Sequence, residues 1–210
     1  MTVQINYKNS ASKITSGNLI LFVNDKYEIE GFEKYISKSE QLYMSDLLKI
    51  SDFKKKLEIF ELSSKRKIIL ISINKNIKNS SIENLGAELY TQIQKRKKSE
   101  YIINLDTLDL NNSNFILHFL HGLKLKSYEF NRYKTKKKNN FIKITVCGNK
   151  LKLTSKNQLK FKALEEGTFY TRDLVSEPGN ILHPDEYAKR LTSLKKDGLK
   201  VNIYDEKKLK

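Results

Sequence analysis

Short apolar segments of strand length alternate along this sequence with longer segments whose apolar residues recur at helical spacing. The segment Lys67–Ile73 (KIILISI) is almost continuously apolar, as expected of a central strand covered on both faces. By contrast, Leu57–Leu62 (LEIFEL) alternates with a period of two, the pattern of a half-buried strand. The clearest helical pattern is Ser81–Lys97, which Ser80 or Ser81 could cap and whose apolar face comprises Ile82, Leu85, Gly86, Leu89, Tyr90 and Ile93. Strands that alternate with helices of this length indicate an α/β layer structure.

The same criteria predict the other elements of the first two thirds of the chain. Further strands are expected at Val3–Tyr7, Asn18–Val23, Glu100–Leu105 and Phe141–Cys147. Further helical patterns occupy Phe32–Ile36, Glu40–Ile50 and Asn114–Tyr128. In Glu40–Ile50 the predicted apolar stripe is Tyr43, Leu47 and Ile50, with Leu42 beside it. In Asn114–Tyr128 the residues expected to face inward are Phe115, Ile116, Phe119, Leu120 and Leu123.

The pattern changes from about residue 155 onward. A long helical pattern at Gln158–Val175 suits a connection between two domains, and Pro178 and Gly179 end it. Pro184 then begins another helix, Leu199–Tyr204 is predicted to be a strand, and Asp205 can cap a last helix. A single strand and the first turn of a helix cannot bury a core. We therefore expect an N-terminal domain at residues 1–155, a connecting helix at 156–178 and the beginning of a truncated α/β domain at 179–210.

The positive charge of the chain is concentrated in its first part. The formal net charge is +16, and residues 1–165 contain 31 Lys and Arg residues against 16 Asp and Glu residues. Such a charge favours anionic partners such as nucleic acids. Only 5 of the 40 basic residues are Arg, however, and Asn and Ile are abundant, as an AT-rich coding sequence would produce. We favour this second explanation, in which the lysines lie on solvated faces, and keep DNA binding as the alternative.

The sequence contains no apolar run near the roughly 20 residues of a membrane helix, and its N-terminus has no signal-peptide pattern. One cysteine, Cys147, allows no internal disulfide. We therefore expect a cytoplasmic protein with no membrane contact.

Two groups of residues are candidates for a site on chemical grounds. His118 and His121 stand three residues apart on a predicted helix and could face one metal ion, but that face offers no Asp, Glu or Cys as a further ligand. We therefore expect both to be partly buried structural histidines, and Cys147 to be a buried strand residue. The second group is the basic run Arg132, Lys134, Lys136, Lys137 and Lys138 around Tyr133, which suits contact with phosphates and suits a solvated loop equally well.

Two segments resemble the leucyl aminopeptidase (cytosol aminopeptidase) family. The first is Gly122–Lys138 (GLKLKSYEFNRYKTKKK), in which a helix leads into Tyr, Phe, Arg, Tyr and Lys residues. The second and more specific one is Thr171–Ala188 (TRDLVSEPGNILHPDEYA), which is similar to the Arg-Asp-Leu, Glu-Pro-Gly-Asn and Leu-x-Pro run of the family. The family's motif residues here are Arg172, Asp173, Glu177, Pro178, Gly179 and Asn180, to which we assign a structural role between helix and connector. His183 departs from the family, where Thr or Asn is commoner.

The resemblance implies a three-layer, macrodomain-like mixed sheet flanked by helices, followed by a linker helix and a truncated α/β catalytic domain. It also implies a homo-hexamer that removes N-terminal residues from peptides, with two divalent metals, manganese or zinc, in the catalytic domain. The family's metal-ligand motifs, including an Asn-Thr-Asp-Ala-Glu-Gly-Arg run, have no match in residues 1–210. We therefore assign no catalytic or metal-binding residue and predict that these 210 residues alone are inactive. ADP-ribose is raised as a ligand only by analogy of fold.

Overall fold

The computed structural model describes residues 3–8, 17–52, 55–94, 98–109, 112, 114–135, 141–149 and 153–209. The chain forms two compact units, residues 1–165 and residues 166–210. The three-part division at residues 155 and 178 stays a prediction.

The first unit contains a six-stranded mixed sheet in the order β1-β6-β5-β2-β4-β3. Only the edge strand β3 runs antiparallel to its neighbour β4, and the other neighbouring strands pair in parallel. The strands are β1 (Val3–Lys8), β2 (Asn18–Val23), β3 (Leu57–Ser63), β4 (Arg66–Ser72), β5 (Lys98–Asn104) and β6 (Phe141–Cys147). All six lie at or within two residues of the predicted strands, which confirms that part of the sequence analysis.

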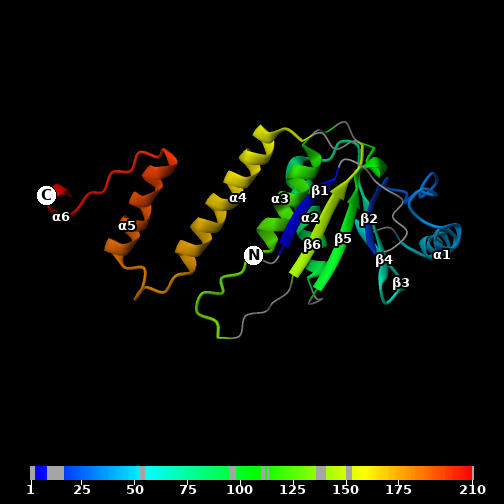
Figure 1. The fold of residues 1–210 in the computed structure, drawn as a ribbon, viewed down its shortest axis with the longest axis horizontal. Helices are drawn as coiled ribbons and strands as arrows, with labels where there is room; N and C mark the ends of the chain where they lie inside the picture. Colours follow the sequence, from blue (N-terminus) through cyan, green and yellow to red (C-terminus); the bar gives the residue numbers. More distant parts are fainter. Residues whose placement is uncertain are drawn as a thin grey trace. The chain divides into compact units, whose positions relative to one another are not determined.

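Helices cover both faces of this sheet, so that the unit has three layers (Figure 1). Helices α2 (Asn79–Ile93) and α3 (Phe115–Lys126) pack on the face that carries Ile20 and Phe22. Helix α1 (Lys38–Lys49) packs on the opposite face, against Leu19 and Leu21. These four strand residues are consecutive and all buried, as the period of two in a strand requires when both faces are covered. The mixed α/β fold predicted from the sequence is thereby confirmed.

Two glycines let α2 and α3 approach each other closely. A Cβ atom placed on Gly86 of α2 would lie 1.9 Å from the backbone oxygen of Phe119 in α3. A Cβ atom placed on Gly122 of α3 would lie 1.9 Å from the backbone oxygen of Glu83 in α2. Neither distance is compatible with a side chain, because the groups that would be hit are backbone atoms with no freedom to rotate away. The reciprocal pair of glycines therefore fixes the separation of the two helices.

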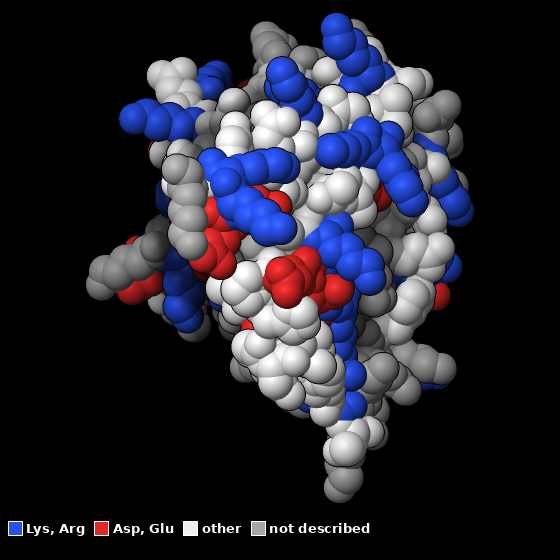
Figure 2. All heavy atoms as spheres, turned by 90° about the vertical axis from the view of Figure 1, so that its left-hand side faces the viewer, with Lys and Arg blue, Asp and Glu red and all other residues white. Residues whose placement is uncertain are grey.

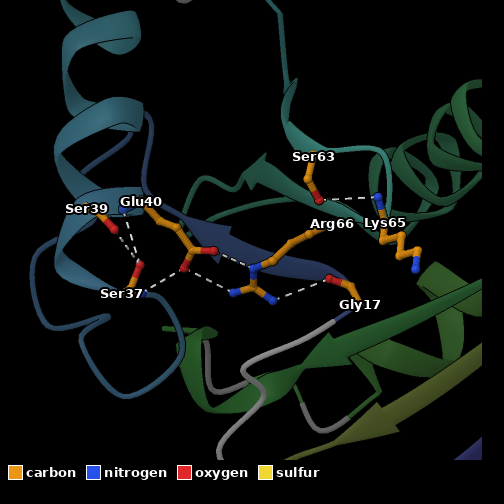
Figure 3. Close-up of polar contacts among 7 residues, drawn as sticks. All are labelled: Gly17, Ser37, Ser39, Glu40, Ser63, Lys65 and Arg66. Atoms are coloured by element: carbon orange, nitrogen blue, oxygen red, sulfur yellow. Dashed lines mark hydrogen bonds and ion pairs between the residues drawn. The ribbon is translucent and has the colours of Figure 1, made fainter.

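Helix α1 is oriented by polar contacts at its N-terminus (Figure 3). Ser37 and Glu40 form a capping box, in which the Ser37 hydroxyl accepts from the Glu40 backbone and the Glu40 carboxylate accepts from the Ser37 backbone. The same carboxylate accepts two hydrogen bonds from Arg66 at the start of β4, one of them 3.1 Å long from Nη2. Burial opposes ionisation of Glu40, but the hydrogen bonds from Arg66 and Ser37 outweigh it and lower the pKa of its carboxyl.

The predicted apolar stripe of α1 was wrong. Met44 and Leu48 are buried, whereas Leu42, Tyr43, Leu47 and Ile50 are all exposed by 36% or more. The reason is the contact of Glu40 with Arg66. Residues four apart lie on one face of a helix, so anchoring Glu40 to β4 also turns Met44 and Leu48 toward the sheet.

Three other predicted features of these elements also differ from the structure. Residues 32–36 form turns and not a helix, and Tyr35 and Ile36 donate backbone hydrogen bonds to Phe32. Helix α2 begins at Asn79, two residues earlier than predicted, and its N-cap is Lys78, with no hydrogen bond from a capping side chain. Helix α4 spans Ser155–Ser176, against the predicted Gln158–Val175, and of its apolar residues Leu174 is buried whereas Leu159, Leu164 and Val175 are exposed.

The second unit is helical. It contains the end of α4, helix α5 (Pro184–Ser193) and the short helix α6 (Glu206–Leu209). Pro184 begins α5, and the Asp205 carboxylate accepts a 3.0 Å hydrogen bond from the backbone of Lys208, as predicted for the cap of α6. The predicted strand at 199–204 was wrong, because residues 166–209 contain no second strand to satisfy its backbone groups. Among the described residues, every helix is too short or too polar to cross a membrane.

Candidate functional site

The most specific sequence motif lies around the end of α4 and is organised by a buried ion pair. The carboxylate of Glu177 has no exposed side-chain surface and accepts a 3.1 Å hydrogen bond from Nη1 of Arg190 in α5. Arg190 also donates from Nε to Glu186, at 3.0 Å, and its backbone oxygen accepts from the Tyr170 hydroxyl at 2.9 Å. These contacts connect α4 and α5 across the turn between them.

Arg190 is a member of this cluster that the sequence analysis did not identify. The available signal was the spacing of Glu186 and Arg190, four residues apart on one helix, which is typical of an ion pair. The hydrogen bonds with Glu186 and Glu177 raise the pKa of Arg190, and the hydrogen bond with Arg190 lowers the pKa of Glu186. Both shifts favour the charged forms of Arg190 and Glu186.

The other residues of the motif surround this pair. Arg172 and Asp173 are half-buried on α4, and the backbone oxygen of Pro178 accepts from the backbone of Ile181 and Leu182. Gly179 and Asn180 are exposed. The structural role assigned to these six residues stays a prediction, with the burial of Glu177 as the observation in its favour.

His118 and His121 lie on one side of α3, against the ring of Phe161 from α4. The ring centroids of His118 and His121 lie 4.8 and 5.6 Å from that of Phe161. Nδ1 of His118 is 2.7 Å from a carboxylate oxygen of Glu83, which comes from α2 and not from the helix that carries both histidines. Among the described residues, no group of three or more His, Cys, Asp and Glu side chains could hold a metal ion.

Burial lowers the pKa of His121, although Glu83 and Glu165 act in the opposite direction. The predicted burial of Cys147 is confirmed, and desolvation raises the pKa of its thiol to about 11. A thiol with this pKa is protonated at neutral pH and is a poor nucleophile.

The described part of the basic run follows α3. Arg132, Tyr133 and Lys134 are exposed, and the ring of Tyr133 packs against Phe130 with centroids 5.8 Å apart. Lys136, Lys137 and Lys138 lie outside the described residues. Figure 2 shows Lys and Arg side chains spread over the face that it draws, with Asp and Glu side chains between them. That face is of mixed sign, and DNA binding stays an untested alternative.

Comparison with known proteins identifies the family. The sequence profile of the "Cytosol aminopeptidase family, N-terminal domain" matches residues 20–137. The chain is 30% identical over 139 residues to a probable cytosol aminopeptidase of Dinoroseobacter shibae and 39% identical over 95 residues to one of Brucella suis. These matches cover 66% and 42% of this chain but only 27% and 19% of the two relatives. The matched part of the chain therefore covers only about a fifth to a quarter of the length of these relatives, 19% and 27%.

Solved structures show the same fold. A tomato leucine aminopeptidase mutant matches 99% of this chain and 45% of its own, with a TM-score of 0.70 and 20% identity. The cytosol aminopeptidase of Coxiella burnetii matches 92% of this chain and 37% of its own, with a TM-score of 0.59 and 14% identity. The bottromycin maturation enzyme BotP in complex with Mn matches 91% of this chain with a TM-score of 0.61. By the match of the family profile to more than half of its residues, the chain belongs to the cytosol aminopeptidase family, a family of hydrolases that act on peptides.

Proposed function

We propose that residues 1–210 are the N-terminal domain and connector of a metal-dependent leucyl aminopeptidase, and that they support assembly and position a catalytic domain outside these residues. The observation that carries the proposal is the profile match at residues 20–137, which corresponds to the N-terminal domain of this family. In such an enzyme two divalent metals, manganese or zinc, would polarise the scissile carbonyl and generate the attacking hydroxide. The name of the neighbour solved with Mn is consistent with this choice of metal.

The structure suggests how the chain would carry out a positioning role. A buried carboxylate that is paired with an arginine holds its partner in one geometry, because breaking the pair leaves an uncompensated charge. Glu177 and Arg190 form such a pair between α4 and α5, in the segment with the family's motif. We propose that this pair sets the direction in which the chain leaves α4, and thereby the orientation of the domain that follows.

Enzyme assays on two lengths of chain test this proposal. The purified 210-residue chain is expected not to hydrolyse leucine p-nitroanilide with added manganese or zinc. A chain extended through the coding sequence that follows Lys210 is expected to hydrolyse it in a metal-dependent manner. Metal-dependent turnover by the 210 residues alone, or a stop codon directly after Lys210, would contradict the proposal.

The positioning role is tested separately in the extended chain. Glu177→Gln is expected to lower kcat while leaving the melting temperature of the N-terminal domain unchanged. The matched control is Asp197→Asn, the same carboxylate-to-amide change at an exposed residue of the second unit, which should leave kcat unchanged. Equal kcat values for both variants and the parent would remove the basis for a positioning role.

A further inference from the structure

A cavity of about 370 Å³ lies within the first unit, between β1, α3 and the beginning of α4. Its volume is within the usual range of small-molecule sites, roughly 300–1,000 Å³. One part of its wall is apolar and is formed by Ile5 of β1, Leu117 and Leu120 of α3, and Phe161 of α4. Both leucines are buried, so this part of the wall is a fixed surface of the core.

Apart from Leu159, the other lining residues are polar, and most of them can donate hydrogen bonds. The Lys124 ammonium donates a 2.8 Å hydrogen bond to Glu165, a carboxylate with a side-chain exposure of only 6%. An ammonium has three donors, so this bond leaves capacity for a further acceptor. Burial, and then the charge of Glu165, raise the pKa of Tyr7, so its hydroxyl stays protonated and can donate as well. Two lysines line the cavity, Lys124 and Lys162, against the single carboxylate of Glu165.

One polar atom of this wall has no partner. Nδ1 of His121 is buried, and among the described residues none is within hydrogen-bond distance of it. A buried nitrogen without a partner costs about 1–3 kcal/mol, and such atoms in native proteins call for an explanation. Because His121 lines the cavity, a bound molecule could supply the missing hydrogen bond.

We infer that this cavity binds a small organic carboxylate with an apolar body, whose carboxylate is held by Lys124 and His121 and whose body lies against Leu117, Leu120 and Phe161. The donor-rich wall and the excess of lysine over glutamate favour an anion, and a buried charge is stable only where it is paired. An amine would meet the same lysines and the same donors and would be repelled. The site is separate from the metal-dependent chemistry of the family and does not depend on the proposed function.

Three ligands with one apolar body test this inference on the unmodified chain. They are 4-methylpentanoate, 4-methylpentanamide and 4-methylpentylamine, each titrated while the ring signals of the three histidines are followed by NMR. The carboxylate is expected to bind most tightly and to shift the His121 signal with saturation, while the signal of His183 stays in place. Binding of the amine as tight as that of the carboxylate, or no saturable shift with any of the three, would overturn the inference.

A pair of variants on the same helix locates the site. His121→Phe removes the nitrogen and keeps a flat ring, and it should weaken binding of the carboxylate by at least about tenfold, the effect of losing one hydrogen bond to a charged group. His118→Phe is the control, since His118 contacts the same Phe161 ring but does not line the cavity. It should change the affinity by less than about twofold. Thermal melting of both variants checks their folding, and equal affinities of the two folded variants would refute the placement of the carboxylate.

Discussion

The close crossing of α2 and α3 gives the sharpest prediction about the fold. Replacing Gly86 or Gly122 by Ala adds a Cβ atom that starts 1.9 Å from a backbone oxygen of the other helix. Ordinary van der Waals contact for such an atom begins near 3.4 Å. Since the obstructing atoms belong to the backbone, relief requires the helices themselves to move apart, which opens the contacts of the residues packed around them.

Two opposing effects determine the size of the change. Ala is a better helix former than Gly by about 1 kcal/mol, which favours the variant. Overpacking of a well-packed core costs about 1–3 kcal/mol and occasionally more, and a clash with backbone belongs at the upper end or beyond. We expect a net loss of about 2 kcal/mol or more in the free energy of unfolding for Gly86→Ala and for Gly122→Ala. In a chain of this size that corresponds to a fall in Tm of roughly 4–8 °C.

The matched control is Gly167→Ala. Gly167 lies inside α4, and a Cβ atom built on it meets nothing within 4 Å. The same substitution should therefore stabilise the chain, by up to about 1 kcal/mol. Urea denaturation followed by circular dichroism measures all three variants. If Gly86→Ala and Gly122→Ala raised stability as Gly167→Ala does, the close approach of the helices would be refuted.

Three further predictions concern α1, His121 and the basic run. Met44→Ala should lower the free energy of unfolding by about 2–5 kcal/mol, whereas Leu42→Ala should change it by less than about 0.5 kcal/mol in the same urea experiment, because only Met44 is buried. Burial lowers the pKa of His121 in the folded chain below its ordinary value of 6.5. Because the unfolded chain then binds the proton more tightly, the free energy of unfolding should fall as the pH is lowered from above 6.5 toward the pKa of the folded chain. Urea titrations across that pH range should show a smaller slope for His121→Phe than for the parent. If the lysines are merely solvated, binding to duplex DNA should be weak both before and after Lys136, Lys137 and Lys138 are replaced together by Ala. If they contact DNA, the triple replacement should reduce the slope of log affinity against log salt concentration by up to about 3.

The sequence was sufficient to locate the strands and to identify the inward face of α3, because their apolar residues are concentrated in short runs or on one wide face. The run Lys67–Ile73 has few polar residues and forms the covered strand β4. Leu57–Leu62 forms most of the edge strand β3, but its burial does not alternate as predicted, because Leu57 and Phe60 are both buried. In α3 all five residues expected to face inward are buried, since this helix has an apolar face wide enough to tolerate small rotations. Where one face of an element is clearly more apolar than the others, the hydrophobic effect alone selects its orientation.

The candidate cavity could not be predicted from local pattern, because its polar residues come from distant segments. His121 and Lys124 are on one helix, but Tyr7 comes from β1 and Glu165 from α4. On its own helix His121 has no Asp, Glu or Cys on the same face, so the local sequence indicates no site there. Only the fold brings Glu165 within 2.8 Å of Lys124, across 41 residues of sequence. The pair Glu177 and Arg190 was closer to prediction, since the motif drew attention to Glu177, though not to its partner.

Helix α1 shows why apolar periodicity can select the wrong face. Its stripe of Tyr43, Leu47 and Ile50 is as apolar as the face that is buried, so hydrophobicity discriminates poorly between the two orientations. The choice then falls to a stronger and more directional contact. Glu40 accepts two hydrogen bonds from Arg66 and is held by the capping box at Ser37, an arrangement available only when Glu40 faces the sheet. The charged pair bridges 26 residues of sequence, beyond the range of any helical pattern. In a helix with two comparable apolar faces, a charged residue near its N-terminus can therefore decide which of them is buried.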